Sequence, residues 1–299
     1  MAASSQLCVV HQPIRSISLP ARLHPGSVTL EAVLNRLKSF QISSVSTIQS
    51  ALVGLAELYN CMEELIPSPL TQQAVLRYEH GRLVEQVLDN SVTLLDTCGN
   101  ARDIIFTMKE HVQSLQSALR RKRVDSRIES DIHAYMCFRK KVKKDIAKCF
   151  KALKQMEGKA DSSTPLLASD DHHLSMVASV LREASAITIS IFKSLLLFLS
   201  MPTLKTNTGG WSLVSRLMPM RLLSNEKGQK IVNEVGCVDI SLCSLHGHLR
   251  NNDAKAEFQL AQRMLETLHL SVEGLEDGLD CIFRSLVQHR VSFLNILAH

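Results

Sequence analysis

The sequence is poor in the residues that make turns and strands. Only 12 Gly and 8 Pro occur among 299 residues, and aromatic residues make up 4% of the chain. An all-β protein needs frequent turn residues, so this composition argues against a sheet. Hydrophobic residues nevertheless reach 45%, and they are chiefly Leu, Val, Ile, Met and Ala. This composition predicts an all-α fold with a sizeable core.

Signatures of enzymes and cofactor sites are missing as well. The chain has no G-x-S-x-G, no phosphate-binding Gly loop with Lys-Ser/Thr, no H-E-x-x-H and no G-x-G-x-x-G motif. Its eight Cys are scattered without a C-x-x-C pair, which predicts reduced thiols in an intracellular protein. The densest group of metal-type ligands is Cys237, Cys243, His246 and His248, but no carboxylate joins it. We therefore expect no catalytic residue, no cofactor and no metal.

Apolar residues recur at helical spacing along most of the chain. The sequence "PSP" at 67–69 is expected to end one helix, and Gly99 to separate two others. The expected helices cover residues 27–40, 44–66, 71–99, 100–122, 125–156, 174 to about 200, 228–249 and a long final segment.

The polar stretch 158–173, "GKADSSTPLLASDDHH", predicts a linker between helical halves 27–157 and 174–299. We expect the two halves to pack as one multi-helix bundle of long antiparallel helices. Residues 1–26 are expected to form a disordered or extended arm, and they lack the continuous apolar run of a secretory leader. The arm is rich in Ser, carries Arg and has no acidic residue before Glu31, which is also typical of an organelle transit peptide. Because a secretory leader is not seen, we expect a cytoplasmic location. The alternatives are a chloroplast, which the transit-like composition suggests, and a membrane surface.

The final segment carries the most regular pattern in the chain. Apolar residues alternate at spacings of three and four, with His289 as the one polar member. Such a 3.5-residue period predicts a coiled-coil-like seam, either inside a one-chain bundle or between copies in a homo-oligomer. Gly274 and Gly278 lie off this seam and can let a neighbouring helix approach closely. The core of the seam is formed by Leu265, Leu268, Val272, Leu275, Leu279, Ile282 and Leu286.

Three motifs in a fixed order carry a family resemblance. They are "RSISLPARLHP" at 15–25, "LLDTCGNARDI" at 94–104 and "SLLLFLSMP" at 194–202. With them the chain resembles the plant Bypass-like family, long filed as a domain of unknown function, from about residue 11 to the end. The resemblance implies an all-α protein without known enzymatic activity that is associated with root and shoot development. It implies no catalytic residues.

Positive charge is concentrated in one segment. Residues 120–154 carry 13 Lys and Arg against 4 Asp and Glu, whereas acidic residues exceed basic ones in the rest of the chain. This segment is typical of a solvated helix face, or of a surface for an acidic protein or an anionic membrane. Its two clusters also resemble a bipartite nuclear import signal, but sparse aromatics and missing fold signatures argue against nucleic-acid binding. The proposed basic patch consists of Arg120, Arg121, Lys122, Arg123, Arg139, Lys140, Lys141, Lys143 and Lys144.

Residues 184–201 form an apolar run with Lys193 near its middle. A spanning helix needs about 20 apolar residues, and a central Lys costs roughly 2.5–3.5 kcal/mol on insertion. We therefore expect a buried core helix. The alternative is a peripheral membrane- or organelle-associated protein that uses the basic helix 120–154 together with this run.

The stretch "RSISLP" places Arg15, Ser18 and Pro20 in the pattern R-S-x-S-x-P. Arg three residues before Ser18 suits a basophilic kinase, and a phosphate would add three acceptor oxygens for an Arg cluster. The pattern resembles ligands of 14-3-3-type adaptors. The alternative is an arm that packs on the bundle, because Ile17 and Leu19 alternate with two serines.

Taken together, these patterns favour a non-enzymatic, helical interaction or regulatory protein of plants with protein partners, regulated through its amino-terminal arm.

Overall fold

The structure is a computed structural model that describes residues 25–42, 44–77, 82–121, 126–162, 172–200, 233–249 and 255–298. Within these ranges all regular secondary structure is α-helical, which confirms the predicted all-α bundle. The helices are α1 (Pro25–Ser39), α2 (Val45–Leu65), α3 (Pro69–Arg77), α4 (Arg82–Arg120), α5 (Ser126–Ser162), α6 (His172–Ser200), α7 (Glu234–His248) and α8 (Lys255–Ala298).

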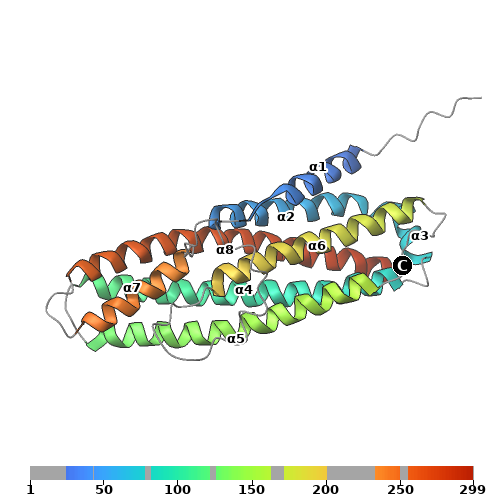
Figure 1. The fold of residues 1–299 in the computed structure, drawn as a ribbon. Helices are drawn as coiled ribbons and strands as arrows, with labels where there is room; N and C mark the ends of the chain where they lie inside the picture. Colours follow the sequence, from blue (N-terminus) through green and yellow to red (C-terminus); the bar gives the residue numbers. More distant parts are fainter. Residues whose placement is uncertain are drawn as a thin grey trace, which may run out of the picture.

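Helices α4 and α8 form the central antiparallel pair (Figure 1). Two ion pairs fix their register, Arg102 with Asp280 at 2.7 Å and Lys109 with Glu276 at 2.7 Å. Helix α8 has 44 residues and is therefore about 66 Å long. Such a helix contacts several partners along its length, and besides α4 it packs mainly against α2 and α7.

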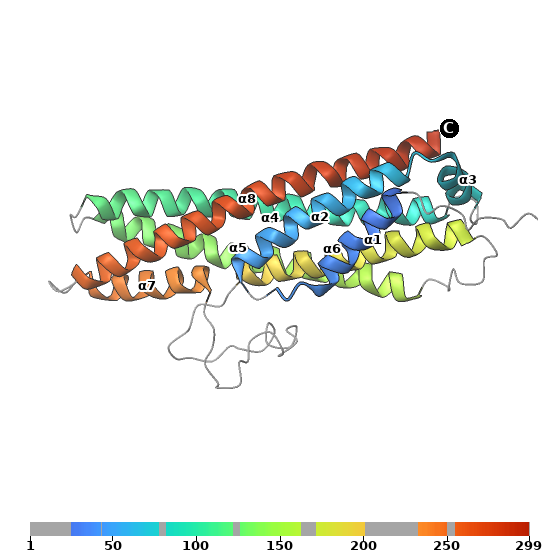
Figure 2. The same cartoon turned by 90° about the horizontal axis from the view of Figure 1, so that it is seen from above.

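Helix α2 runs parallel to α8. Gln49 donates to the carbonyl oxygen of Ser271 near the start of α2, and Glu63 contacts His289 near its end. Helices α5 and α6 complete the bundle on the other side of α4, and α1 lies across α2 and α6 (Figure 2). Buried side chains from every one of these helices join a single hydrophobic core.

Helix ends follow local capping chemistry. Ser44 and Thr47 form a reciprocal capping box at the start of α2, with N···O distances of 3.0 and 3.3 Å. At the start of α7, Asn233 accepts from the backbone N–H of Gly236 at 2.9 Å. The amide of Asn233 also donates to the carbonyl oxygen of Phe198 at 2.8 Å, which ties the start of α7 to the end of α6.

The predicted break at Gly99 is wrong, because α4 continues from Arg82 to Arg120 without interruption. Glycine in a helix interior costs about 1 kcal/mol relative to alanine. The neighbours Cys98 and Ala101 are buried against α8, and tertiary packing of this kind outweighs a weak local propensity. Cys98 also donates from its thiol to the carbonyl oxygen of Leu279 at 3.7 Å.

All seven residues of the seam are at most 1% exposed. The helices that cover α8 are α2, α4 and α7 of the same chain. The seam is therefore occupied by intramolecular packing.

Gly278 and Gly274 lie where α8 crosses α2. A Cβ atom added to Gly278 would lie 3.1 Å from Cβ of Leu52, and one added to Gly274 would lie 2.2 Å from Nε2 of Gln49. Gly278 therefore allows a close approach of the two helices, as its place beside the seam suggested, and Gly274 leaves room for the side chain of Gln49.

Candidate functional site

The basic segment extends from the end of α4 into α5. Arg120 and Arg121 are exposed at the end of α4, whereas Lys122 and Arg123 lie outside the described residues. Lys140 lies fourteen residues into α5, about 21 Å along the helix from its first residue. The second cluster therefore begins well inside α5, away from the basic residues at the end of α4.

Six lysines of α5 share its outer face, and we name this set the α5 lysine face. Their spacing of three or four residues, with Lys141 beside the row, places them on one side of the helix. Along residues 140–155 the other exposed side chains are Ala147 and Gln155. The face extends over about 21 Å from its first lysine to its last. Its members are Lys140, Lys141, Lys144, Lys148, Lys151 and Lys154, all exposed.

The basic patch predicted from the sequence stops at Lys144 and omits Lys148, Lys151 and Lys154, which continue the same face. The signal that finds them is the helical spacing from Lys144 onward. Lys143 does not lie on this face and is half-buried. Its positive charge acts on the Asp239 carboxylate, on the inner side of α5.

Arg139 does not belong to an exposed patch, and its assignment there is corrected. The residue is 2% exposed, and its Nε donates to both carboxylate oxygens of Asp239 on α7 at 3.1 Å. Its Nη1 donates to the carbonyl oxygen of Leu199 on α6 at 2.6 Å. Arg139 follows Tyr135 by four residues, so both side chains point into the bundle rather than toward solvent.

The Tyr135–Arg139–Asp239 cluster joins three helices at one end of α6. The hydroxyl of Tyr135 donates to Asp239 at 2.8 Å, so the carboxylate has both a charged and a neutral donor. Burial raises the pKa of the Asp239 carboxyl, and the guanidinium of Arg139 opposes that shift. Burial also raises the pKa of Tyr135, which remains a hydrogen-bond donor. This arrangement holds α7 against α5 and α6, and it leaves Arg139 no access to an external partner.

The apolar run 184–201 lies on α6, except for Met201, which is outside the described residues. Among the described helices α6 alone is long and apolar enough to cross a membrane, and 56% of its most apolar window is buried inside the bundle. Phe192, Leu195 and Leu199 are each at most 1% exposed. Lys193 pairs with Glu157 of α5 at 2.5 Å, so the central charge has a partner at the bundle surface.

The four residues weighed as metal ligands do not converge. His246 faces Glu129 of α5 at 3.6 Å, and His248 contacts the carbonyl oxygen of Ser244 at 2.8 Å. Cys237 is half-buried and Cys243 is exposed. In the part of the chain that the structure describes, no group of three metal-type side chains comes together.

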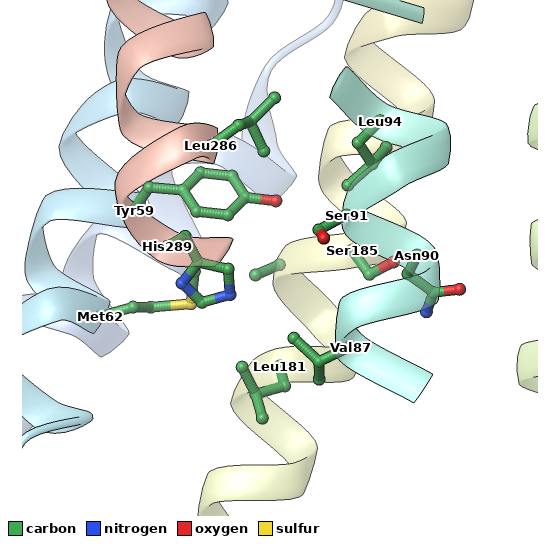
Figure 3. A pocket seen from close by; sticks show the side chains of 11 residues that line it. Tyr59, Met62, Val87, Asn90, Ser91, Leu94, Leu181, Ser185, Leu286 and His289 are labelled. Atoms are coloured by element: carbon green, nitrogen blue, oxygen red, sulfur yellow. The ribbon is translucent and has the colours of Figure 1, made fainter. Parts of the chain in front are cut away.

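A small, partly open cavity of about 40 Å³ lies between α2, α4, α6 and α8. Figure 3 shows His289 of α8 beside Tyr59 and Met62 of α2, facing Ser91 of α4 and Ser185 of α6. This volume has room for a few water molecules at most.

Two polar side chains that line this cavity, His289 and Tyr59, have hydrogen-bond partners on neighbouring helices. His289 contacts Glu63 at 3.1 Å through Nδ1, and the Glu63 carboxylate also accepts from Ser292. Burial raises the pKa of Tyr59 to about 12, and its hydroxyl pairs with Thr188 at 3.1 Å. The spacing pattern identifies His289 only as a polar member of the seam, because its partner Glu63 is 226 residues away.

The proposed phosphosite of Arg15, Ser18 and Pro20 lies outside the described residues. It therefore stays a prediction from the sequence.

The fold and these sites define an all-α helical bundle with a row of exposed lysines along one outer helix. A family model described as Protein BPS1, the Bypass-like family, matches residues 51–296, so the chain belongs to this family. The family is a plant developmental signalling family and not a known enzyme family, and membership points to a developmental regulator. Neither a search of curated proteins nor a search of solved structures found a match.

Proposed function

We propose that this protein is a non-enzymatic interaction protein of plants that acts in root and shoot development by binding partners through its surface. The observation that carries the proposal is the α5 lysine face. Six exposed lysines on one side of a rigid helix form a preorganised positive surface that side chains of the bundle leave accessible. A regulator that works by binding needs such a surface rather than a catalytic group.

Regulation through the amino-terminal arm is the second part of the proposal. Phosphorylation of Ser18 adds about −1.5 to −2 charges, and Arg15 and Pro20 complete a motif that suits a 14-3-3-type adaptor. Titration of a phosphorylated peptide of residues 10–25 against such an adaptor tests this part. The phosphopeptide is expected to bind far more tightly than its unphosphorylated form, and equal affinities would refute the motif.

Proximity labelling in plant cells tests the proposed function itself. The wild type is compared with Ser18→Ala and with a variant that carries Gln at Lys140, Lys144, Lys151 and Lys154. We expect the lysine variant to lose neighbours that the wild type labels, and Ser18→Ala to lose the adaptor. Identical neighbours for all three proteins would contradict action through either surface.

The proposal places the protein in the cytoplasm, where the face can meet soluble or membrane-bound partners. Import into a chloroplast is the competing location. Imaging of the full chain with a carboxyl-terminal fluorescent tag distinguishes the two.

A further inference from the structure

We propose that the α5 lysine face is a docking surface for an anionic lipid bilayer, to which the protein binds peripherally. This inference rests on the proposed function, because it names the partner of the same face. The six lysines lie along a straight helix over about 21 Å. Each Lys near an anionic membrane surface strengthens binding about fivefold, so a row of six is sufficient for reversible attachment.

The charge of the face is largely uncompensated inside the protein. Lys148 pairs with Asp145 at 3.0 Å on the same helix, but 79% of the lysine side chain stays exposed. Glu157, the next carboxylate along α5, is engaged by Lys193 of α6. The remaining lysines of the face have no carboxylate within ion-pair distance among the described residues.

The composition of the face favours a lipid surface over a folded acidic protein. Protein interfaces are enriched in aromatic residues, Met and Arg and are depleted of Lys. On this face all the cations are Lys, and the other exposed residues are Ala147 and Gln155, so no large side chain anchors a partner. Specific recognition of a phosphate group commonly uses the planar fork of Arg, but the arginine in this part of α5 is buried. A flexible row of point charges suits a diffuse layer of anionic headgroups.

Docking through this face needs no insertion of the apolar helix. Helix α6 stays in the core, with Lys193 held by Glu157. Attachment is then electrostatic, and salt weakens it because exposed charges are screened within about 10 Å at 0.1 M ionic strength.

The test measures co-sedimentation of the full chain with vesicles. One set is phosphatidylcholine alone, and in the other one lipid in three is phosphatidylserine. We expect the wild type to bind the anionic vesicles at least about tenfold more tightly than the neutral ones, and raised salt to release it. Gln at Lys140, Lys144, Lys151 and Lys154 together is expected to reduce binding to the anionic vesicles about a hundredfold or more, since each lysine contributes about fivefold.

A matched variant controls for net charge. It carries Gln at four exposed basic residues on other faces, namely Arg182, Lys255, Arg263 and Arg284. This variant is expected to keep most of the vesicle binding, and circular dichroism of both variants checks that they remain folded. Equal losses in the two variants would show that net charge, not this face, attracts the membrane, and would overturn the proposal.

A parallel titration with polyglutamate distinguishes a protein partner. Binding of polyglutamate through the four lysines without binding of anionic vesicles overturns the lipid assignment and leaves the proposed interaction function intact. Vesicle binding that the four substitutions do not change also overturns it. The proximity-labelling experiment in cells distinguishes the two failures. Neighbours that still depend on the four lysines mean that only the lipid assignment has failed, whereas neighbours that do not depend on them mean that the proposed function has failed as well.

Discussion

A buried guanidinium is stable only while a carboxylate lies beside it, and Arg139 illustrates the dependence. Its partner Asp239 is 0% exposed, and the hydroxyl of Tyr135 is the only other side-chain donor recorded on that carboxylate among the described residues. The attraction within such a pair mainly offsets the cost of removing both ions from water. Removing one member therefore costs more than the pair contributes.

We predict that Asp239→Ala lowers the free energy of unfolding by about 3–5 kcal/mol, because it leaves the charge of Arg139 buried without compensation. Urea denaturation monitored by circular dichroism measures the loss. Replacing the whole cluster with apolar residues, as Tyr135→Phe, Arg139→Met and Asp239→Leu, is expected to recover most of it. A cost below about 1 kcal/mol for Asp239→Ala would show that water reaches the pair.

His111 links stability to pH. Burial lowers its pKa from the ordinary value of 6.5, although Glu110 and Asp131 act in the opposite direction. The centroid of its ring lies 4.9 Å from that of Phe138 and 6.2 Å from that of Tyr135. Below pH 6.5 the unfolded chain takes up a proton at His111 more readily than the folded chain does, so the stability from this group is lost as the pH falls.

The matching prediction compares wild type with His111→Asn in urea at about pH 7 and about pH 5. The wild type is expected to lose more stability than the variant on acidification, since Asn does not titrate. Equal losses would mean that the folded and unfolded states bind this proton alike.

At the scale of the helix, glycine has opposite effects on stability at two positions. Gly99 has no atom within 4 Å of an added Cβ, so it costs α4 helical stability without helping the packing. Gly278 lies against Cβ of Leu52, which is joined directly to the backbone of α2 and cannot swing away. Helix propensity favours Ala at both positions, and only the neighbouring helix distinguishes them.

We predict that Gly99→Ala raises the free energy of unfolding by up to about 1 kcal/mol. Gly278→Ala is expected to lower it by about 1 kcal/mol, because an overpacked core costs about 1–3 kcal/mol and propensity returns part of that. Urea denaturation of the two variants side by side measures both effects. A rise of similar size in both would mean that α2 and α8 can separate at no cost.

At the scale of the molecule, helices from both ends of the chain depend on each other. Helix α8 packs between α2, α4 and α7, and α6 contacts α2, α4 and α5. The core of the amino-terminal half is therefore completed by helices that follow the 158–173 stretch. Neither half encloses its own apolar surface.

We predict that residues 25–162 and residues 172–299, produced separately, each lack a cooperative unfolding transition, whereas the full chain unfolds in one. Thermal denaturation by circular dichroism and calorimetry measures this. The full chain is also expected to sediment as a monomer at all concentrations, because its seam is filled from within. A half with its own sharp transition would identify an independent domain.

Prediction from sequence succeeded where periodicity was long and uniform. The 3.5-residue pattern of α8 identified its buried side, and the "PSP" stretch marked the end of α2 within one residue. The break at Gly99 failed because a propensity of about 1 kcal/mol competes with the burial of a whole helix face. Arg139 was placed with its neighbours on the surface because a charge count ignores the side of the helix on which each residue lies.

The sequence by itself determined the all-α class, the family and the concentration of charge in α5, because composition and spacing act locally and repeat along the chain. Only the tertiary structure decided which partner each surface meets. Arg139 pairs with Asp239, which is 100 residues away in the sequence, and His289 contacts Glu63, which is 226 residues away. Such pairs depend on how whole helices pack, and periodicity within one helix contains no information about its neighbour. The same packing buried α6 and left six lysines of α5 exposed to whatever the protein binds.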